Sequence, residues 1–165
     1  MPNAYFEAYN FFTSSTMLAV DDDVQAKKFA EAYAERCSTP GRLTQKFYDD
    51  AYAVAYDQDK LNLDEETQRK RFVRDFALTC YSASLITDQA YRQLDEFARS
   101  VEMMNLDDLE ARKFIYRFLL TCGRENYLTQ HNFEKLKNYA MEKLNKGIIE
   151  AEEMTRQFFL EFKSL

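Results

Sequence analysis

The chain has 165 residues, of which 46% are hydrophobic and 30% charged, a balance that argues against a disordered protein. Three Gly and two Pro are too few for the tight turns of a β-rich fold, so long helices joined by short loops are expected. A net charge of −6, with Lys and Arg interleaved among acids, disfavours a nucleic-acid partner, and no apolar run is long enough for membrane insertion.

The first predicted unit, residues 1–38, reads as two helices. The second helix should begin at Asp21, whose carboxylate caps its first turn, and should bury Phe29 and Tyr33 one turn apart. The first helix is apolar on more than one face, which is typical of a helix that lies deep in a protein or covers a partner. The alternative to a partner is that the two terminal helices of the chain pack on each other. The candidate partner-binding residues of this helix are Phe6, Phe11 and Phe12.

Residues 39–81 and 82–123 repeat the pattern at a period of 42 to 43 residues. Each unit opens its first helix at a Thr whose hydroxyl can cap it, with apolar positions four, seven and eleven residues further on. An apolar residue followed by an acid then precedes the second helix, which carries two Phe four residues apart. These landmarks are Thr44, Leu63-Asp64 and Phe72–Phe76 in one unit, and Thr87, Leu106-Asp107 and Phe114–Phe118 in the next.

The fourth unit, residues 124–165, starts its first helix at Thr129 and its second at Glu150, after Ile149. Phe158 and Phe162 align with the aromatic pairs of the other units. Because this last helix is also apolar on more than one face, Phe158, Phe159 and Phe162 are further candidate partner-binding residues. The sequence therefore predicts an all-α fold of four tandem helix-turn-helix units of about 42 residues, in one domain (1–165) or in two lobes (1–81 and 82–165).

Cys37, Cys80 and Cys122 each follow an aromatic stripe at the same repeat position. Their odd number, wide spacing and lack of a CxxC pair predict reduced, buried thiols and neither a disulfide framework nor a zinc site. The first 26 residues contain no Lys or Arg, so neither a secretory nor a transit peptide is expected. A cytoplasmic or other intracellular reducing compartment is therefore predicted.

The order of Leu-Thr, an aromatic residue, Leu, Ala and then an apolar residue with an acid resembles the EF-hand fold of calmodulin-like proteins and myosin light chains. The resemblance covers the whole chain, and it implies that the apolar loop residues Val20, Leu63, Leu106 and Ile149 pair between neighbouring hands. The ligands of a calcium loop do not carry over. Only one weak candidate loop remains, which keeps Gly147 and Glu153. A short α-solenoid is the alternative architecture.

Catalytic patterns are absent from the sequence: His131 is the only histidine, and three Gly cannot form a Gly-rich phosphate loop. We therefore expect no enzyme and no cofactor. The predicted function is a protein-interaction module, such as an adaptor, a light-chain-like subunit or a structural subunit, that binds a partner helix or protein surface. The alternatives are a calcium sensor or buffer, and a carrier of an apolar small ligand.

Overall fold

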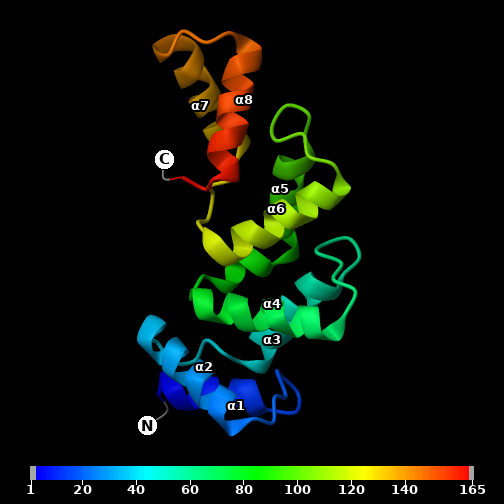
Figure 1. Ribbon diagram of the computed structural model, residues 1–165, viewed down its shortest axis with the longest axis vertical. Helices are drawn as coiled ribbons and strands as arrows, with labels where there is room; N and C mark the ends of the chain where they lie inside the picture. The colour runs from blue at the N-terminus through cyan, green and yellow to red at the C-terminus, as the bar shows by residue number, and fades with distance from the viewer. Residues whose placement is uncertain (1–2, 164–165) are drawn as a thin grey trace. The chain divides into compact units, whose positions relative to one another are not determined.

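A computed structural model describes residues 3–163, and every regular element in that range is helical (Figure 1). The predicted all-α fold is thereby confirmed. A short 3-10 helix, η1 (Ala83–Ile86), lies between the fourth and fifth α-helices. The α-helices are α1 (Ala4–Thr13), α2 (Asp23–Arg36), α3 (Gln45–Tyr56), α4 (Glu66–Thr79), α5 (Asp88–Arg99), α6 (Asp108–Thr121), α7 (Gln130–Lys143) and α8 (Ile148–Leu160).

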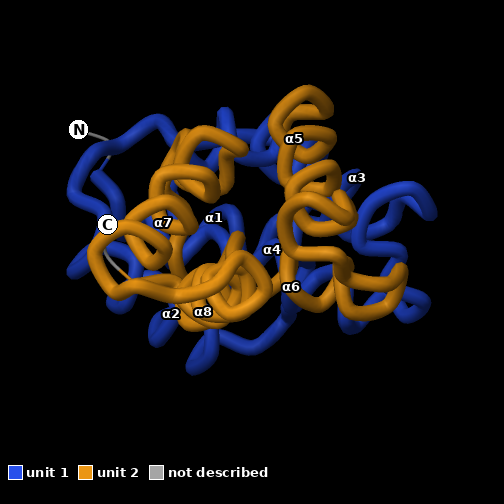
Figure 2. The backbone as a smooth tube through the Cα atoms, turned by 90° about the horizontal axis from the view of Figure 1, so that it is seen from above, with its two compact units in different colours: residues 1–86 blue, residues 87–165 orange. Residues whose placement is uncertain are grey.

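Consecutive helices pack together as four hairpins: α1 with α2, α3 with α4, α5 with α6, and α7 with α8. The hairpins group into two compact units, unit 1 (residues 1–86) and unit 2 (residues 87–165), which Figure 2 shows in different colours. The boundary falls after η1, a few residues beyond the predicted 81/82 division. Each unit therefore contains two copies of the repeat.

Threonine caps start the first helix of three hairpins, as predicted. The Oγ1 atoms of Thr44, Thr87 and Thr129 accept hydrogen bonds from the backbone N–H three residues ahead, at 3.1, 3.2 and 3.2 Å. Such a bond satisfies one of the backbone donors that a helix leaves unpaired in its first turn.

Replacing Thr87 with alanine is expected to lower the free energy of unfolding by about 1 kcal/mol, because α5 loses its cap. Urea denaturation followed by circular dichroism measures the change. The control is Asp64→Ala, since no side chain caps α4 and Asp64 is exposed. That control should stay within about 0.5 kcal/mol of the wild type. Equal losses in both variants would mean that the Thr87 hydroxyl does not stabilise the helix.

The predicted acid caps of the second helices are right only for Asp107, which accepts from the N–H of Glu110 at 2.8 Å. In the first hairpin the cap is Asp22, one residue after the predicted Asp21, and it accepts from Gln25 at 3.1 Å. No side chain caps α4 or α8. In these three hairpins the number of residues between the apolar landmark and the start of the second helix differs from the number that the repeat predicts.

One loop geometry joins the helices of the first three hairpins. The backbone N–H groups of Val20, Leu63 and Leu106 donate to the carbonyl oxygen eight residues earlier, at 3.0, 2.8 and 2.9 Å. The residue before each is left-handed, with φ of 54°, 52° and 54°. These N–H groups are thus used inside their own hairpins and are not donated to a neighbouring loop.

The loop of the fourth hairpin is shorter, which corrects the sequence alignment. Lys146 donates to the carbonyl of Ala140, only six residues earlier, at 3.1 Å, and follows left-handed Asn145. Lys146 therefore takes the place that the sequence assigned to Ile149, which is 73% exposed. Because α8 starts earlier than predicted, its buried positions shift as well, to Ala151, Thr155 and Phe159.

The core of each unit is built around Phe rings, and the two units use the same arrangement. In unit 1 the Phe11 and Phe47 rings meet edge to face at 6.0 Å, and Phe47 stacks on Phe76 at 5.8 Å. In unit 2 the Phe97 and Phe133 rings meet edge to face at 6.1 Å, and Phe133 stacks on Phe159, also at 6.1 Å. Phe159 is therefore the counterpart of Phe76, and unit 2 repeats the plan of unit 1.

Tyr91 of α5 is a buried phenol whose hydroxyl has no hydrogen-bond partner among the described residues. Burial raises the pKa of this phenol above its ordinary value of 10.0. Below that pH the phenol is neutral in both the folded and the unfolded chain. Above it the unfolded chain loses the proton first, so Tyr91 makes the protein progressively less stable as the pH rises beyond about 10.

Tyr91→Phe is expected to leave stability at pH 7 unchanged or to raise it by about 1 kcal/mol, because it removes an unsatisfied buried hydroxyl. The variant should also lose less stability than the wild type between about pH 9 and pH 11. Urea midpoints at several pH values measure both effects. A variant that is less stable at pH 7, with an unchanged alkaline slope, would show that the hydroxyl is satisfied in solution.

The three cysteines occupy the C-caps of α2, α4 and α6, so the repeat does place them alike. Cys37 and Cys80 form a disulfide, with their Cα atoms 5.7 Å apart. The expectation of three reduced thiols is therefore wrong, and only Cys122 is free. The bond joins equivalent helix ends of two successive hairpins, which explains why its partners are one repeat period apart in the sequence.

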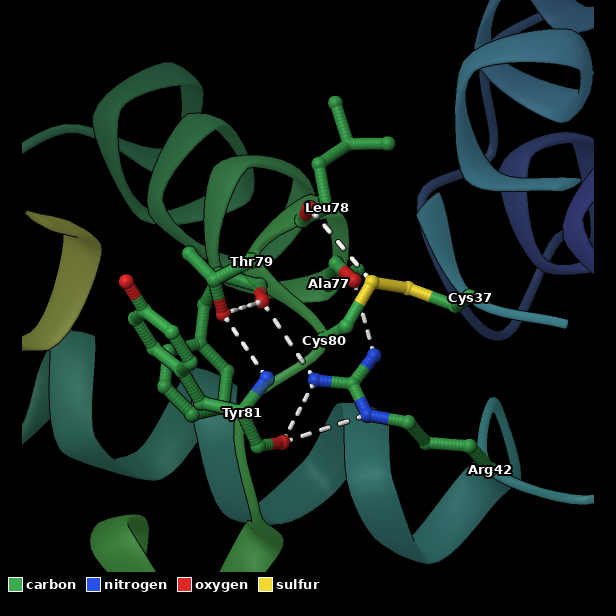
Figure 3. The surroundings of a disulfide bond; sticks show 8 residues. Cys37, Arg42, Ala77, Leu78, Thr79, Cys80 and Tyr81 are labelled. Carbon is green, nitrogen blue, oxygen red and sulfur yellow. Dashed lines mark hydrogen bonds between the residues drawn. A yellow bond between two sulfur atoms is a disulfide. The ribbon is translucent and has the colours of Figure 1, made fainter. Parts of the chain in front are cut away.

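Arg42 reinforces the same junction in unit 1 (Figure 3). Its guanidinium donates to the carbonyl of Ala77 at 2.7 Å and to that of Tyr81 at 2.8 Å, beside the disulfide. These carbonyls lie at the C-terminal end of α4, where backbone acceptors lack helical partners and the helix dipole favours a cation.

Unit 2 closes the corresponding junction without a covalent bond. Lys163 stands at the position of Cys80 when Phe159 is aligned with Phe76, so Cys122 has no thiol partner there. Arg124 spans the gap instead: its guanidinium lies 3.3 Å from the Cys122 sulfur and donates to the carbonyl of Lys163 at 2.9 Å. An arginine clamp thus takes the place of the disulfide.

Candidate interaction surface

The candidate partner-binding residues at the N-terminus divide between surface and core. Phe6 is 61% exposed, and its ring lies edge to face with that of Tyr5 at 5.6 Å. Phe11 and Phe12 are buried, and both pack against Phe29 of α2. Their assignment to a binding surface is corrected, because both rings fill the core of unit 1.

The candidates at the C-terminus divide in the same way. Phe159 is fully buried, so it too is a core residue rather than part of a surface. The Phe162 ring is half-buried and lies 5.3 Å from Phe114 and 5.8 Å from Phe118. Phe158 is half-buried beside Phe159. Of the six candidates, Phe6 is exposed, and Phe158 and Phe162 are half-buried.

The weak candidate metal loop does not form a loop. Gly147 is the N-cap of α8, and Glu153 lies on that helix with its side chain exposed. Because α7 ends at Lys143 and α8 starts at Ile148, too little non-helical chain is left to wrap around a calcium ion. Across residues 3–163 no group of three or more His, Cys, Asp or Glu side chains could hold a metal ion.

Helix α7 is the least buried of the long helices. It has the same length as α6, 14 residues, but it buries only Phe133 and Ala140. Five residues of α6 are buried: Ala111, Phe114, Ile115, Phe118 and Leu119. The outer face of α7 also lines a shallow groove of about 510 Å³, whose wall includes His131, Leu136 and Tyr139. Most of this helix therefore faces outward.

Four large apolar side chains near the turn from α7 to α8 are exposed to solvent. Tyr139, Leu144, Ile148 and Ile149 are all exposed, Ile149 to 73%. We call these four residues the α7–α8 tip. Charged groups flank them, including the Lys146–Glu150 ion pair with 3.5 Å between nitrogen and oxygen. An apolar centre with a charged rim is the usual composition of a protein-binding surface.

The sequence pattern did not single out this surface. Ile149 was assigned to the repeat as an internal loop residue, and Tyr139 and Leu144 stand outside the predicted stripe of α7. The available signal was the apolar pair Ile148-Ile149 directly after the polar turn of residues 145–147. That pair does not identify a surface by itself, because adjacent apolar residues of a helix can share one buried face, as Phe114 and Ile115 do in α6.

No protein-family model matches the chain, and no curated protein or solved structure matches it either. Among residues 3–163 no helix combines the length and the apolar character needed to cross a membrane.

Proposed function

We propose that the protein is a non-enzymatic interaction module whose α7–α8 tip binds an apolar helix or surface of a partner protein. The observation that carries the proposal is the low burial of α7, which keeps only two residues in the core while Tyr139 and Ile148 nearby are exposed. Exposed aliphatic and aromatic side chains that gather on a monomer mark contact sites more often than scattered ones do.

The energetics of the tip suit a partner of this kind. Fully burying an isoleucine or leucine side chain contributes about 1.5–3 kcal/mol, so Ile148, Ile149 and Leu144 together can drive an association. Tyr139 adds an aromatic ring, a residue type enriched at interfaces. The Lys146–Glu150 pair at the edge would contribute to specificity rather than to affinity.

Such a module would act as an adaptor, a light-chain-like subunit or a structural subunit. The sequence resemblance to EF-hand proteins supports a light-chain-like role, since it lies in the spacing of apolar residues and not in the calcium ligands. No calcium chemistry is part of the proposal.

The test is affinity capture from a native extract with the tagged full chain, followed by mass spectrometry. Wild type is compared with Ile148→Asp/Ile149→Asp, in which two apolar contacts become charged. The substitutions lie in the first turn of α8, where the helix dipole stabilises acidic side chains, so this variant should stay folded. The matched control is Val101→Asp, which changes a valine with 72% exposure in the α5–α6 loop.

We expect the wild type and Val101→Asp to capture one partner equally. The Ile148→Asp/Ile149→Asp variant should lose that partner. Recovery of the same proteins by all three chains would contradict the proposal. So would loss of capture by Val101→Asp to the same extent as by the tip variant, because a general effect of charge would then explain the result.

A further inference from the structure

A cleft of about 440 Å³ opens in unit 1 between the α1–α2 loop and the outer face of α4. One wall is apolar: it presents the half-buried side chain of Val20, with the buried Phe12 and Leu18 behind it. The opposite wall is formed by α4, where Lys70, Arg71 and Arg74 project at adjacent positions of the helix. The volume lies within the range of clefts that enclose small ligands or single side chains of a partner.

The charge of this cleft is opposite to that of the protein. Three cations and one carboxylate line it, in a chain whose net charge is −6. Lys70 pairs with Glu66 at 3.7 Å and Arg74 with Asp75 at 3.0 Å. Arg71 is exposed, and no residue in the described part of the chain pairs with it. A cation without a carboxylate partner stands next to an apolar wall.

Unit 2 provides an internal comparison, because it repeats the plan of unit 1. When Phe159 is aligned with Phe76, the positions of Lys70, Arg71 and Arg74 hold Glu153, Met154 and Gln157. The cationic wall is therefore a property of unit 1 alone and does not follow from the repeat.

In unit 2, hydrogen bonds bridge the corresponding space between the α5–α6 loop and α8. Arg156, at the position of Val73, donates to the carbonyl of Met103 at 2.6 Å and to that of Val101 at 3.2 Å. These hydrogen bonds tie α8 to the α5–α6 loop. In unit 1 the apolar Val73 cannot make them, and the space between loop and helix stays open.

We propose that the unit 1 cleft binds an acidic segment of a partner protein, with a carboxylate against Arg71 and its two neighbouring cations. An adjacent apolar side chain of the segment packs on Val20. Charge complementarity identifies the anionic part of the ligand, and the apolar wall requires a hydrophobic group beside it, which free phosphate lacks. The inference extends the proposed protein-binding function and does not involve the α7–α8 tip.

The test begins with a random peptide library displayed on phage and selected on the full chain. The best selected peptide is then labelled, and its affinity is measured by fluorescence anisotropy. We expect selected peptides to carry Asp or Glu next to Leu, Ile or Phe. Lys70→Glu/Arg71→Glu should weaken binding at least about tenfold, and Arg71→Gln, a milder change of an exposed residue, should weaken it less. Raising the ionic strength from about 0.1 M to about 1 M should also weaken binding.

The control is Lys135→Glu/Lys143→Glu, which makes the same change in charge on exposed lysines of α7 and should leave affinity unchanged. Thermal melts establish that each variant is folded. Selection of no peptides or of peptides without acids, equal affinity for the cleft variants, or full displacement of the peptide by inorganic phosphate would each overturn the inference. If Lys70→Glu/Arg71→Glu still captures the partner of the α7–α8 tip, the proposed function stands whether or not the cleft binds a peptide.

Discussion

Replacing Phe97 with alanine is expected to destabilise unit 2 by about 3–5 kcal/mol, the usual loss when a large buried ring is truncated. Phe97 is 1% exposed, and its ring lies 5.1 Å from that of Phe159, 6.1 Å from Phe133 and 6.4 Å from Phe114. These three rings come from α6, α7 and α8. The cavity would therefore open where both hairpins of the unit meet.

Native-state hydrogen exchange of the amides in residues 87–163 measures this loss within unit 2 itself. The matched control is Phe6→Ala, which removes the same atoms from an exposed ring and should change stability by no more than about 0.5 kcal/mol. If Phe97→Ala were as stable as Phe6→Ala, the two hairpins of unit 2 would not share a core.

Replacing both Cys37 and Cys80 with serine is expected to lower the free energy of unfolding of unit 1 by about 4 kcal/mol. The bond closes a loop whose ends are 43 residues apart, and it restricts the unfolded chain by that amount in the chain-entropy account. A reductant should produce the same loss in the wild type and no loss in the double variant. Urea denaturation with and without dithiothreitol measures both.

The control for the disulfide is Cys122→Ser, which removes a thiol without a covalent partner and should respond to reductant as the wild type does. A thiol assay on the denatured, unreduced chain should count one reactive cysteine. In a second measurement, an alkylating agent is added at the moment of extraction, so that every reduced cysteine is labelled. Three labelled cysteines would support the reducing compartment that the sequence predicts, since disulfides persist in oxidising compartments.

The sequence predicts the helical content and most of the buried aromatic residues of the second helices, because both depend on local periodicity. Thr44, Thr87 and Thr129 cap their helices where the repeat placed them, and Phe72 and Phe114 are buried as expected. The spacing of side chains along one helix fixes which of them share a face, so these features need no knowledge of neighbouring hairpins.

Features that depend on contacts between hairpins were predicted less well. The Cys37–Cys80 bond needs the ends of α2 and α4 to lie side by side, and cysteine spacing alone does not show that. The short loop before α8 moved the buried position from Phe158 to Phe159, because a change in loop length rotates every later residue of the helix. The same shift exposed Ile149 and thereby created part of the α7–α8 tip.

Candidate site residues were the least predictable part. An apolar residue on a second helix face can be core or surface, and the sequence pattern treats the two alike. Phe11 and Phe12 are core residues because α2 covers them, whereas Phe6 of the same helix is exposed. The cleft beside Arg71 could not be predicted, although Arg69, Lys70 and Arg71 are consecutive in the sequence. Helix periodicity does not show that the α1–α2 loop lies opposite this basic segment.

Hydrogen–deuterium exchange of the full chain, alone and with the partner recovered by capture, shows whether the α7–α8 tip is the surface that binds. Binding is expected to slow exchange in α7 and the first turn of α8, around residues 134–150, while the Phe core of unit 2 exchanges as before. Protection confined to other helices, or a complex that leaves residues 134–150 unchanged, would contradict this expectation.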